Sequence, residues 1–341
     1  MSASMRAITV SGSALVLRGV PEPILRQGEV LLEVHATALN RADLSQADGH
    51  YPPPPGESQV MGLEAAGVVV AAPGADRWLG RSACALLTGG GYAERVAVPA
   101  GMLMEVPAGW SYLEAAALPE ATLTAYLNLF LEARLKEGER VLVHGGASGV
   151  GLAAIKLAKL AGCTVYATAG GSAKVAACHA QGADMALDRH GPAFQDAISQ
   201  HSGGGVDVIL DMVGAPYFAA NLDLLRTGGR LVFIAALGGR EVGFDIRTLM
   251  TKRAHLIGST LRGRPLAEKL RLVESFHDRF GRSLEPLRPV IDSVFELDQA
   301  GAAHDRMRSN LNIGKIVLRV RPGAEASAPD PGTETVAGLR A

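Results

Sequence analysis

The stretch Arg140-Val-Leu-Val-His-Gly-Gly-Ala-Ser-Gly-Val-Gly-Leu-Ala-Ala-Ile-Lys-Leu-Ala-Lys-Leu-Ala-Gly-Cys163 decides the fold. Residues 141–143 form a short apolar run that is typical of a strand buried on both faces. A glycine-rich turn follows at once. Small or apolar residues then recur at helical spacing until Gly162, which is well placed to end a helix. The segment therefore predicts a strand, a tight turn and a helix.

The turn carries a nucleotide signature. Gly149, Gly151 and Ala154 match the G-x-G-x-x-[G/A] dinucleotide fingerprint. Glycines let backbone N–H groups approach a pyrophosphate, and the helix N-terminus adds partial positive charge. We interpret the turn as a nucleotide site. The alternative is a plain strand-to-helix turn, because such turns need glycine for their backbone alone.

Composition narrows the class of protein. The 341 residues suggest two domains, and 33 basic against 34 acidic side chains give no electrostatic reason to expect nucleic acid or an anionic membrane as partner. No run approaches the ~18 apolar residues of a membrane span, and we expect no signal peptide, because the first residues lack a charged segment followed by a long apolar run. Cys84, Cys163 and Cys178 are too few and too scattered for a disulfide framework. We expect buried thiols in a cytoplasmic protein.

The chain divides into four parts. Residues 1–121 hold short apolar runs between Gly/Pro segments, which is typical of a β-rich domain. Residues 122–262 alternate strand and helix patterns, which predicts parallel strands in a doubly wound α/β sheet. Residues 263–321 are expected to return to the first domain and close its β structure. Residues 322–341, rich in Pro, Gly, Ala, Ser and Thr, predict a disordered tail.

Single elements follow from the same patterns. Helices are expected within 113–131, where Pro119 divides the pattern in two, and at 174–181, 217–225, 265–280 and 299–309. Strands are expected at 7–10, 28–36, 68–72, 92–98, 141–143, 164–169, 206–213, 230–236, 255–259, 289–295 and 313–320.

Further motifs lie along most of the chain: Ala38-Leu-Asn-Arg-Ala-Asp-Leu44, Tyr51-Pro-Pro-Pro54, Gly62-Leu-Glu-Ala-Ala-Gly67, Gly89-Gly-Gly-Tyr-Ala-Glu94 and Asn312-Ile-Gly-Lys-Ile-Val-Leu318. With the glycine turn, this plan resembles the medium-chain dehydrogenase/reductase superfamily, in particular its zinc-independent NADPH:quinone oxidoreductase branch, the zeta-crystallin group. The resemblance covers residues 5–320. It implies a doubly wound parallel Rossmann sheet with a β-rich GroES-like catalytic domain, NADPH in the interdomain cleft, and a homodimer.

The resemblance also argues against a metal. Zinc-dependent members carry a cysteine where this chain has Asn40-Arg41, and Gly-His-Glu where it has Gly62-Leu-Glu64. Zinc takes about four close N, S or O ligands, but no cysteine precedes Cys84 here, and His35 within a strand is expected to be packed rather than to bind metal. Without a Lewis acid, alcohol oxidation is disfavoured. Reduction of an electron-poor acceptor such as a quinone suits such a site.

The choice of cofactor rests on the end of the second strand. NAD-binding versions carry an acid there for the ribose hydroxyls, but residues 167–174 contain none. Ser172 and Lys174 can donate to a 2′-phosphate. The family uses Gly-Ser-x-x-Lys and a later tyrosine. Here the serine stands one place late and Arg189 takes the tyrosine position, which favours NADPH. The alternative makes Ser172 a helix N-cap and Lys174 a solvated first-turn residue.

The resemblance assigns three catalytic residues. Asn40 is expected to donate to the nicotinamide ribose or to a substrate carbonyl, Tyr51 to stack on or hydrogen-bond a quinone, and Ser148 to line the site. Packing of the Tyr51 ring on the polyproline loop is the alternative. Lys315 either reaches the cofactor or is exposed. The expected cofactor-binding residues are Asn40, Thr124, Ser148, Gly149, Val150, Gly151, Gly171, Ser172, Lys174, Arg189, Ala236, Leu237 and Lys315.

The sequence thus predicts a cytoplasmic enzyme that reduces small-molecule quinones with NADPH. Relatives in the zeta-crystallin group transfer electrons singly and yield semiquinones, an outcome that these residues leave open. One rival is a reductase of α,β-unsaturated carbonyls, which needs a proton donor, with Tyr51 the convenient candidate. Another is a non-enzymatic, crystallin-like protein that binds NADPH without turnover.

Overall fold

The computed structural model describes residues 4–12, 14–191 and 194–328. The chain forms two compact units: unit 1 comprises Met1–Glu120 and Pro265–Ala341, and unit 2 comprises Ala121–Arg264. Within the described ranges, no helix has both the length and the apolar character needed to cross a membrane.

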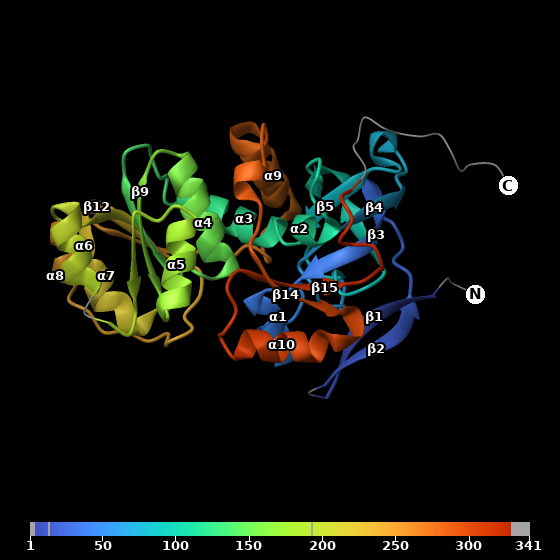
Figure 1. Cartoon of the computed structure of the whole chain (residues 1–341), viewed down its shortest axis with the longest axis horizontal. Helices are drawn as coiled ribbons and strands as arrows, with labels where there is room; N and C mark the ends of the chain where they lie inside the picture. The colour runs from blue at the N-terminus through green and yellow to red at the C-terminus, as the bar shows by residue number, and fades with distance from the viewer. Residues whose placement is uncertain (1–3, 13, 192–193, 329–341) are drawn as a thin grey trace. The chain divides into compact units, whose positions relative to one another are not determined.

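Unit 1 is built on a mainly antiparallel sheet (Figure 1). Its strands are β1 (Ser4–Ser11), β2 (Ala14–Pro21), β3 (Glu29–Ala38), β4 (Glu64–Ala71), β5 (Ser82–Leu86), β6 (Arg95–Pro99), β7 (Leu103–Glu105), β14 (Ile291–Glu296) and β15 (Lys315–Arg319). The main sheet has the order β14-β15-β3-β4-β5-β7, β6 also pairs with β3, and β1 pairs with β2. β15 pairs antiparallel with β3, so the segment after unit 2 adds strands to the sheet that residues before unit 2 form.

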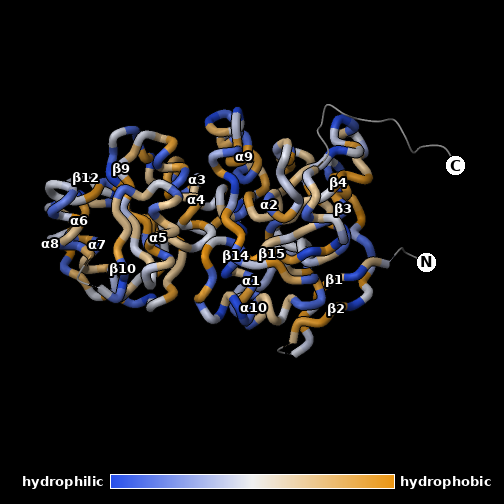
Figure 2. The backbone as a smooth tube through the Cα atoms, viewed as in Figure 1, coloured by the Kyte–Doolittle hydropathy of each residue, from blue (hydrophilic) through white to orange (hydrophobic). Residues whose placement is uncertain are grey.

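Among its described residues, unit 1 contains the α-helices α1 (Arg41–Ala47), α2 (Tyr112–Ala116), α9 (Leu266–Phe280) and α10 (Ala300–Arg308). α9 is amphipathic, since Leu272, Val273 and Phe276 are buried while Arg271 and Glu274 are exposed. Figure 2 shows apolar and polar segments interleaved along each unit, as expected where every element turns an apolar face inward.

Unit 2 is a doubly wound parallel sheet, which confirms the predicted α/β class. Its strands are β8 (Arg140–His144), β9 (Thr164–Ala169), β10 (Met185–Asp188), β11 (Val206–Asp211), β12 (Leu225–Phe233) and β13 (His255–Gly258), and its sheet order is β10-β9-β8-β11-β12-β13. Every neighbouring pair is parallel. The chain builds outward from β8 in one direction and then from β11 in the other. The carboxyl ends of β8 and β11 therefore form a topological switch point, where ligands bind in such sheets.

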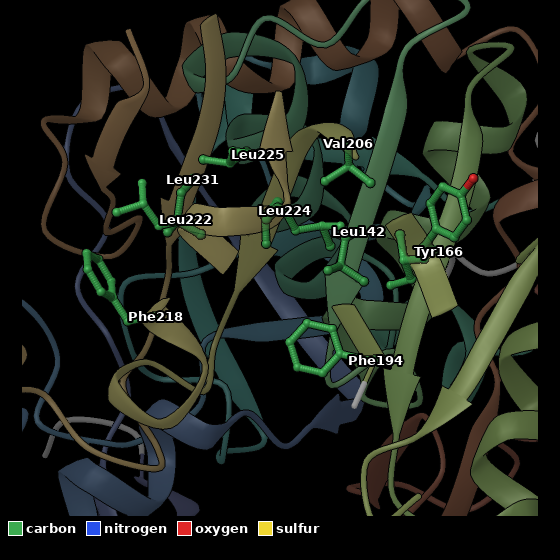
Figure 3. Close-up of a cluster of buried hydrophobic side chains, with 11 residues drawn as sticks. Leu142, Tyr166, Phe194, Val206, Phe218, Leu222, Leu224, Leu225 and Leu231 are labelled. Atoms are coloured by element: carbon green, nitrogen blue, oxygen red, sulfur yellow. The ribbon is translucent and has the colours of Figure 1, made fainter. Parts of the chain in front are cut away.

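Helices cover both faces of this sheet (Figure 1). They are α3 (Pro119–Tyr126, which begins in unit 1), α4 (Gly149–Leu160), α5 (Ser172–Ala180), α6 (Phe194–Ser202), α7 (Phe218–Leu224) and α8 (Ile246–Lys252). Between sheet and helices lies an apolar cluster that includes Leu142, Tyr166, Phe194, Ile209 and Phe218 (Figure 3). Strands buried on both faces need continuous apolar runs, and for this reason they could be recognised in the sequence.

Other elements were missed. β5 is Ser-Ala-Cys-Ala-Leu and lacks the β-branched and aromatic residues that signal a strand. The sequence patterns also did not predict β2, β7, β10, α1, α6 or α8. The expected tail also begins too early. Ala324 is fully buried and the N–H of Ala328 donates to the Trp110 carbonyl over 2.9 Å, so residues 322–328 pack on unit 1. Residues 329–341 of the expected tail lie outside the described range.

Candidate functional site

The glycine turn between β8 and α4 is closed tightly enough to exclude side chains. A Cβ atom on Gly151 would lie 2.4 Å from the Gly145 carbonyl oxygen and 2.6 Å from that of Gly146. A Cβ on Gly146 would lie 2.8 Å from Cys178 Sγ. Gly145 itself has φ +62°, a conformation that favours glycine. The conformation and close packing of this turn therefore require glycine at positions 145, 146 and 151, beside the switch point of the sheet.

Ser148 is the N-cap of α4. Its Oγ accepts a hydrogen bond from the Gly151 N–H over 3.0 Å and lies 3.5 Å from Met212 Sδ. A helix leaves its first N–H groups without intrahelical partners. With that of Gly151 capped, those of Gly149 and Val150 remain as the first-turn donors that an anion can engage, and both residues are partly exposed.

A buried network of hydrogen-bonded polar side chains supports this edge of the sheet. His144 at the end of β8 contacts Thr168 Oγ1 over 2.8 Å and Asn221 Oδ1 over 2.7 Å, and Asn221 Nδ2 donates to Asp211 Oδ2 over 3.0 Å. Since the Asn221 amide nitrogen faces the carboxylate, its oxygen must accept, so His144 carries its proton on Nε2. Burial lowers the pKa of His144, which keeps it neutral. Asp211 then accepts from the Val213 N–H over 2.6 Å and fixes the loop after β11.

The loop after β9 is fastened to the end of β10. Asp188 Oδ1 accepts from the Gly171 N–H over 3.0 Å, and the Arg189 N–H donates to the Ala169 carbonyl over 2.8 Å. The Arg189 guanidinium lies against Gly170, where a Cβ atom would stand 3.0 Å from Nε. The structure therefore brings Gly171 and Arg189 together at the carboxyl edge of the sheet.

Two expectations about this loop change. Gly171, with φ +85°, is the N-cap of α5, and Ser172 is its first helical residue, so the alternative role of Ser172 as N-cap is wrong. Ser172 is exposed and Lys174 partly exposed on the first turn. Residues 167–174 contain no acid, but the Asp188 carboxylate reaches this strand end from the neighbouring strand, which the sequence patterns did not predict.

In unit 1, four segments converge on a buried ion pair. Lys315 Nζ donates to Glu64 Oε1 over 2.6 Å, to Asn40 Oδ1 over 2.7 Å and to the Leu39 carbonyl over 2.7 Å. Asn40 Nδ2 donates to Glu64 Oε1 over 2.8 Å, and the Glu120 N–H donates to Glu64 Oε2 over 2.8 Å. Lys315 is buried, so the alternative that it is simply exposed is wrong. Its three ammonium hydrogens hold Asn40, Glu64 and the backbone.

Asp43 lies beside this pair, at the start of α1. It accepts from the Asn40 N–H over 2.7 Å and from the Tyr92 hydroxyl over 3.2 Å, while Tyr92 also contacts His304 Nε2 over 3.3 Å. Burial raises the pKa of Asp43 to about 6 and lowers that of His304 to about 4. Asp43 Oδ1 is buried without a hydrogen-bond partner. A structural role therefore suits Asp43, whose carboxyl caps α1.

The other expected site residues occupy loops or helix ends. Tyr51 follows α1, is partly exposed and donates its N–H to the Ser45 carbonyl over 3.2 Å. Thr124 lies in α3 with its carbonyl accepting from Asn128 Nδ2 over 2.7 Å. The Leu237 N–H donates to the Met212 carbonyl over 3.2 Å, and the Leu237 side chain is 58% exposed.

A zinc site does not fit these residues. Both Glu64 oxygens accept from nearby donors, and no cysteine or histidine accompanies Glu64 among its hydrogen-bond partners. Over the described ranges, no three His, Cys, Asp or Glu side chains group as a metal would need. His35 packs on Tyr112 with ring centroids 4.3 Å apart, and the three cysteines are buried thiols that form no disulfide with one another, both as expected.

Two known families match the chain. The "Alcohol dehydrogenase GroES-like domain" matches residues 26–108, and "Zinc-binding dehydrogenase" matches residues 149–275. The chain is 31% identical to a quinone oxidoreductase of Lama guanicoe over 334 residues, covering 93% of this chain and 98% of that protein. It is 34% identical to the quinone oxidoreductase of Thermus thermophilus, solved also in complex with NADPH, with TM-score 0.79, 93% of this chain and 100% of that one.

Longer proteins match as well. The chain is 30% identical to a synaptic vesicle membrane protein VAT-1 homolog of Danio rerio and 35% identical to erythronolide synthase EryA2 of Saccharopolyspora erythraea. The two matches include 89% and 87% of this chain, but only 66% and 8% of the length of those two proteins, respectively.

Proposed function

This chain belongs to the medium-chain dehydrogenase/reductase family, and from that premise we propose that it is an NADPH-dependent, zinc-independent reductase of quinones. The glycine turn is the observation that carries the proposal. A turn too tight for a Cβ atom at Gly151, followed by a capped helix at the switch point, suits a pyrophosphate. Gly149 and Val150 would hold the pyrophosphate.

The preference for NADPH over NADH rests on the loop after β9. Arg189 there offers a guanidinium beside Gly170, with Ser172 and Lys174 on the first turn of α5. Guanidinium groups bind phosphate oxygens through charge-assisted hydrogen bonds. The related quinone oxidoreductase of Thermus thermophilus forms a complex with NADPH, which supports the same cofactor here.

The acceptor side is proposed to lie at Asn40 and Tyr51. Bound NADPH supplies the reducing electrons, and a quinone accepts them without a Lewis acid. The Asn40 amide is held by Lys315 and Glu64, so it is oriented before any acceptor arrives. The partly exposed Tyr51 offers a ring and a hydroxyl. Transfer in single electrons is the narrower form of this proposal.

The test is oxidation of NADPH and NADH by chelator-treated protein, with 1,2-naphthoquinone and 1,4-benzoquinone as acceptors. Turnover that prefers NADPH and survives chelation supports the proposal, and Tyr51→Phe should lower kcat/KM by about tenfold if the hydroxyl binds the acceptor. Absence of quinone turnover despite NADPH binding would refute it. Saturation of an enone would then assign an enone reductase, and no turnover of any acceptor a non-enzymatic role.

We further propose a homodimer joined through unit 2. β13 is an edge strand, and Leu237, Ile246 and Met250 nearby in sequence are 58%, 64% and 69% exposed. Light scattering should give twice the 35.5 kDa chain mass for the wild type. Ile246→Asp with Met250→Asp should give a monomer, whereas Ile24→Asp, a control at an exposed residue of unit 1, should not. A monomeric wild type at micromolar concentration would refute the dimer.

A further inference from the structure

The ends of β9 and β10 are bound into one rigid corner. The two strands are parallel, with Asp188 in register with Ala169. Asp188 Oδ1 accepts from the Gly171 N–H and from the His190 N–H, each over 3.0 Å. The backbone adds a bond of 2.8 Å from the Arg189 N–H to the Ala169 carbonyl. Two of these hydrogen bonds fasten residues 188–190 to residues 169–171, and the bond from the His190 N–H closes residues 188–190 on the Asp188 carboxylate.

This corner sets the place of two cationic or protonatable side chains. The Arg189 guanidinium lies against Gly170, whose missing side chain leaves room for it, and Arg189 Nε donates to His190 Nε2 over 3.2 Å. Tyr217 lies near Arg189. Burial raises the pKa of the Tyr217 hydroxyl, and the positive charge of Arg189 opposes this with a smaller lowering effect. Removal of the Asp188 carboxylate would therefore take away the hydrogen-bond acceptor that the Gly171 N–H and the His190 N–H share.

Asp188 can act here in two ways. An acid at the end of the second Rossmann strand ordinarily binds the ribose hydroxyls of NAD and repels a 2′-phosphate. Asp188 comes instead from the third strand of the sheet. Its Oδ1 accepts hydrogen bonds from the backbone N–H groups of Gly171 and His190. Those N–H groups, first that of His190 and then that of Gly171, hold the pKa of the carboxyl below its usual range, so it stays charged. A carboxylate engaged in this way fixes a loop.

We infer that Asp188 is the positioning residue for selectivity toward 2′-phosphorylated nucleotides: it clamps the corner so that Arg189, with His190 beside it, meets the 2′-phosphate. The inference rests on the proposed use of NADPH. It differs from the expected contacts at Ser172, Lys174 and Arg189 because it assigns an acid to the phosphate side of the cofactor. Removal of a negative charge should therefore weaken the binding of a negatively charged group.

The test is isothermal titration of the full chain with 2′,5′-ADP and with 5′-AMP, which differ by the 2′-phosphate. Asp188→Ala should weaken 2′,5′-ADP by about tenfold to a hundredfold, the range for a lost charge-assisted hydrogen bond, and leave 5′-AMP within twofold. Asp188→Asn, which keeps an oxygen acceptor for the two N–H groups, should retain 2′,5′-ADP affinity. A loss of general stability alone would move both probes together.

A double-mutant cycle shows whether Asp188 acts through Arg189. Arg189→Ala should lose a similar factor for 2′,5′-ADP, and adding Asp188→Ala should cost little more. Asp184→Ala is the matched control, because Asp184 also binds a β9 N–H, at 2.7 Å from Val165, but at the other end of the strand. It should leave the ratio of the two affinities unchanged.

Two results would overturn the inference. If Asp188→Ala and Asp188→Asn both weaken 5′-AMP while 2′,5′-ADP binds as well or better, the carboxylate is a ribose ligand. If Asp188→Ala leaves the affinity ratio unchanged while Arg189→Ala lowers it, the clamp has no role in selectivity. In both cases the wild type still binds nucleotide and the proposed function stands. Failure of the wild type to bind either probe removes the proposed function itself.

Discussion

Replacing Lys315 with methionine should destabilise unit 1 strongly. The substitution keeps the length of the side chain but removes the ammonium group that neutralises Glu64, whose side chain is fully buried, while that of Lys315 is 5% exposed. Removing one partner of a buried ion pair costs about 3–5 kcal/mol, because the other charge is left unpaired. That cost is roughly two to nearly four orders of magnitude in the unfolding equilibrium. Asn40 would also lose the donor to its carbonyl oxygen.

Guanidinium unfolding followed by tryptophan fluorescence reports on the stability of unit 1, because both tryptophans, Trp78 and Trp110, lie in that unit. Adding Glu64→Gln to Lys315→Met should recover most of the loss, because glutamine can occupy the site without charge. Arg308→Met is the control. It removes a bridge to Asp48 whose two side chains are 44% and 41% exposed, and should cost no more than about 1 kcal/mol. A loss below about 1 kcal/mol for Lys315→Met would refute the reasoning.

Three further predictions concern single residues. Burial raises the pKa of Asp43 from 3.8 to about 6, so the native state holds the extra proton between these values. Its stabilising contribution is complete below pH 3.8 and is lost as pH rises through 6. Asp43→Asn should therefore gain about 3 kcal/mol relative to wild type between pH 4 and 7 in unfolding titrations, and a flat difference would contradict this. Gly151→Ala should abolish most NADPH binding, because the new Cβ would lie 2.4 Å from the Gly145 carbonyl oxygen. Gly301→Ala is the control: no atom lies within 4 Å of its new Cβ, and the substitution should stabilise the chain by about 0.5–1 kcal/mol. Ser148→Ala should lose about 1 kcal/mol through the cap of α4, and Ser148→Thr should lose little; equal stabilities would argue against the cap.

The fold could be predicted where its signals are local. β8 and β11 are buried on both faces, so their apolar runs identified them, and the glycines before α4 marked a turn that the structure closes to within contact distance. β5 and β7 gave no such signal, since a strand of small residues or of three residues resembles a loop. β2 has no buried residue, and its exposed and partly exposed residues do not alternate.

The site is harder because its contacts join distant positions. Lys315 and Glu64 are 251 positions apart, and sequence spacing offers no reason to bring them together. The hydrogen-bonded network of His144, Asn221 and Asp211 was missed for the same reason. His144 and Asp211 end β8 and β11, which overlap the strands predicted at 141–143 and 206–213. Parallel strands end at a common edge, so polar residues at two such ends were a usable signal.

Asp188 shows why the kind of residue at a strand end does not by itself decide the choice of cofactor. Residues 167–174 contain no acid, and from this the sequence argues for NADPH. Yet a carboxylate from β10 does reach Gly171, and if it faced a ribose the same conclusion would reverse. What separates the two interpretations is which donors the carboxylate oxygen already serves, and here they are the N–H groups of Gly171 and His190. Glu64 and Asp211 likewise accept from backbone N–H groups, at Glu120 and Val213. In this chain these acids accept hydrogen bonds from the backbone next to the expected ligand positions, and we propose that Arg189 supplies the charge that meets a cofactor phosphate.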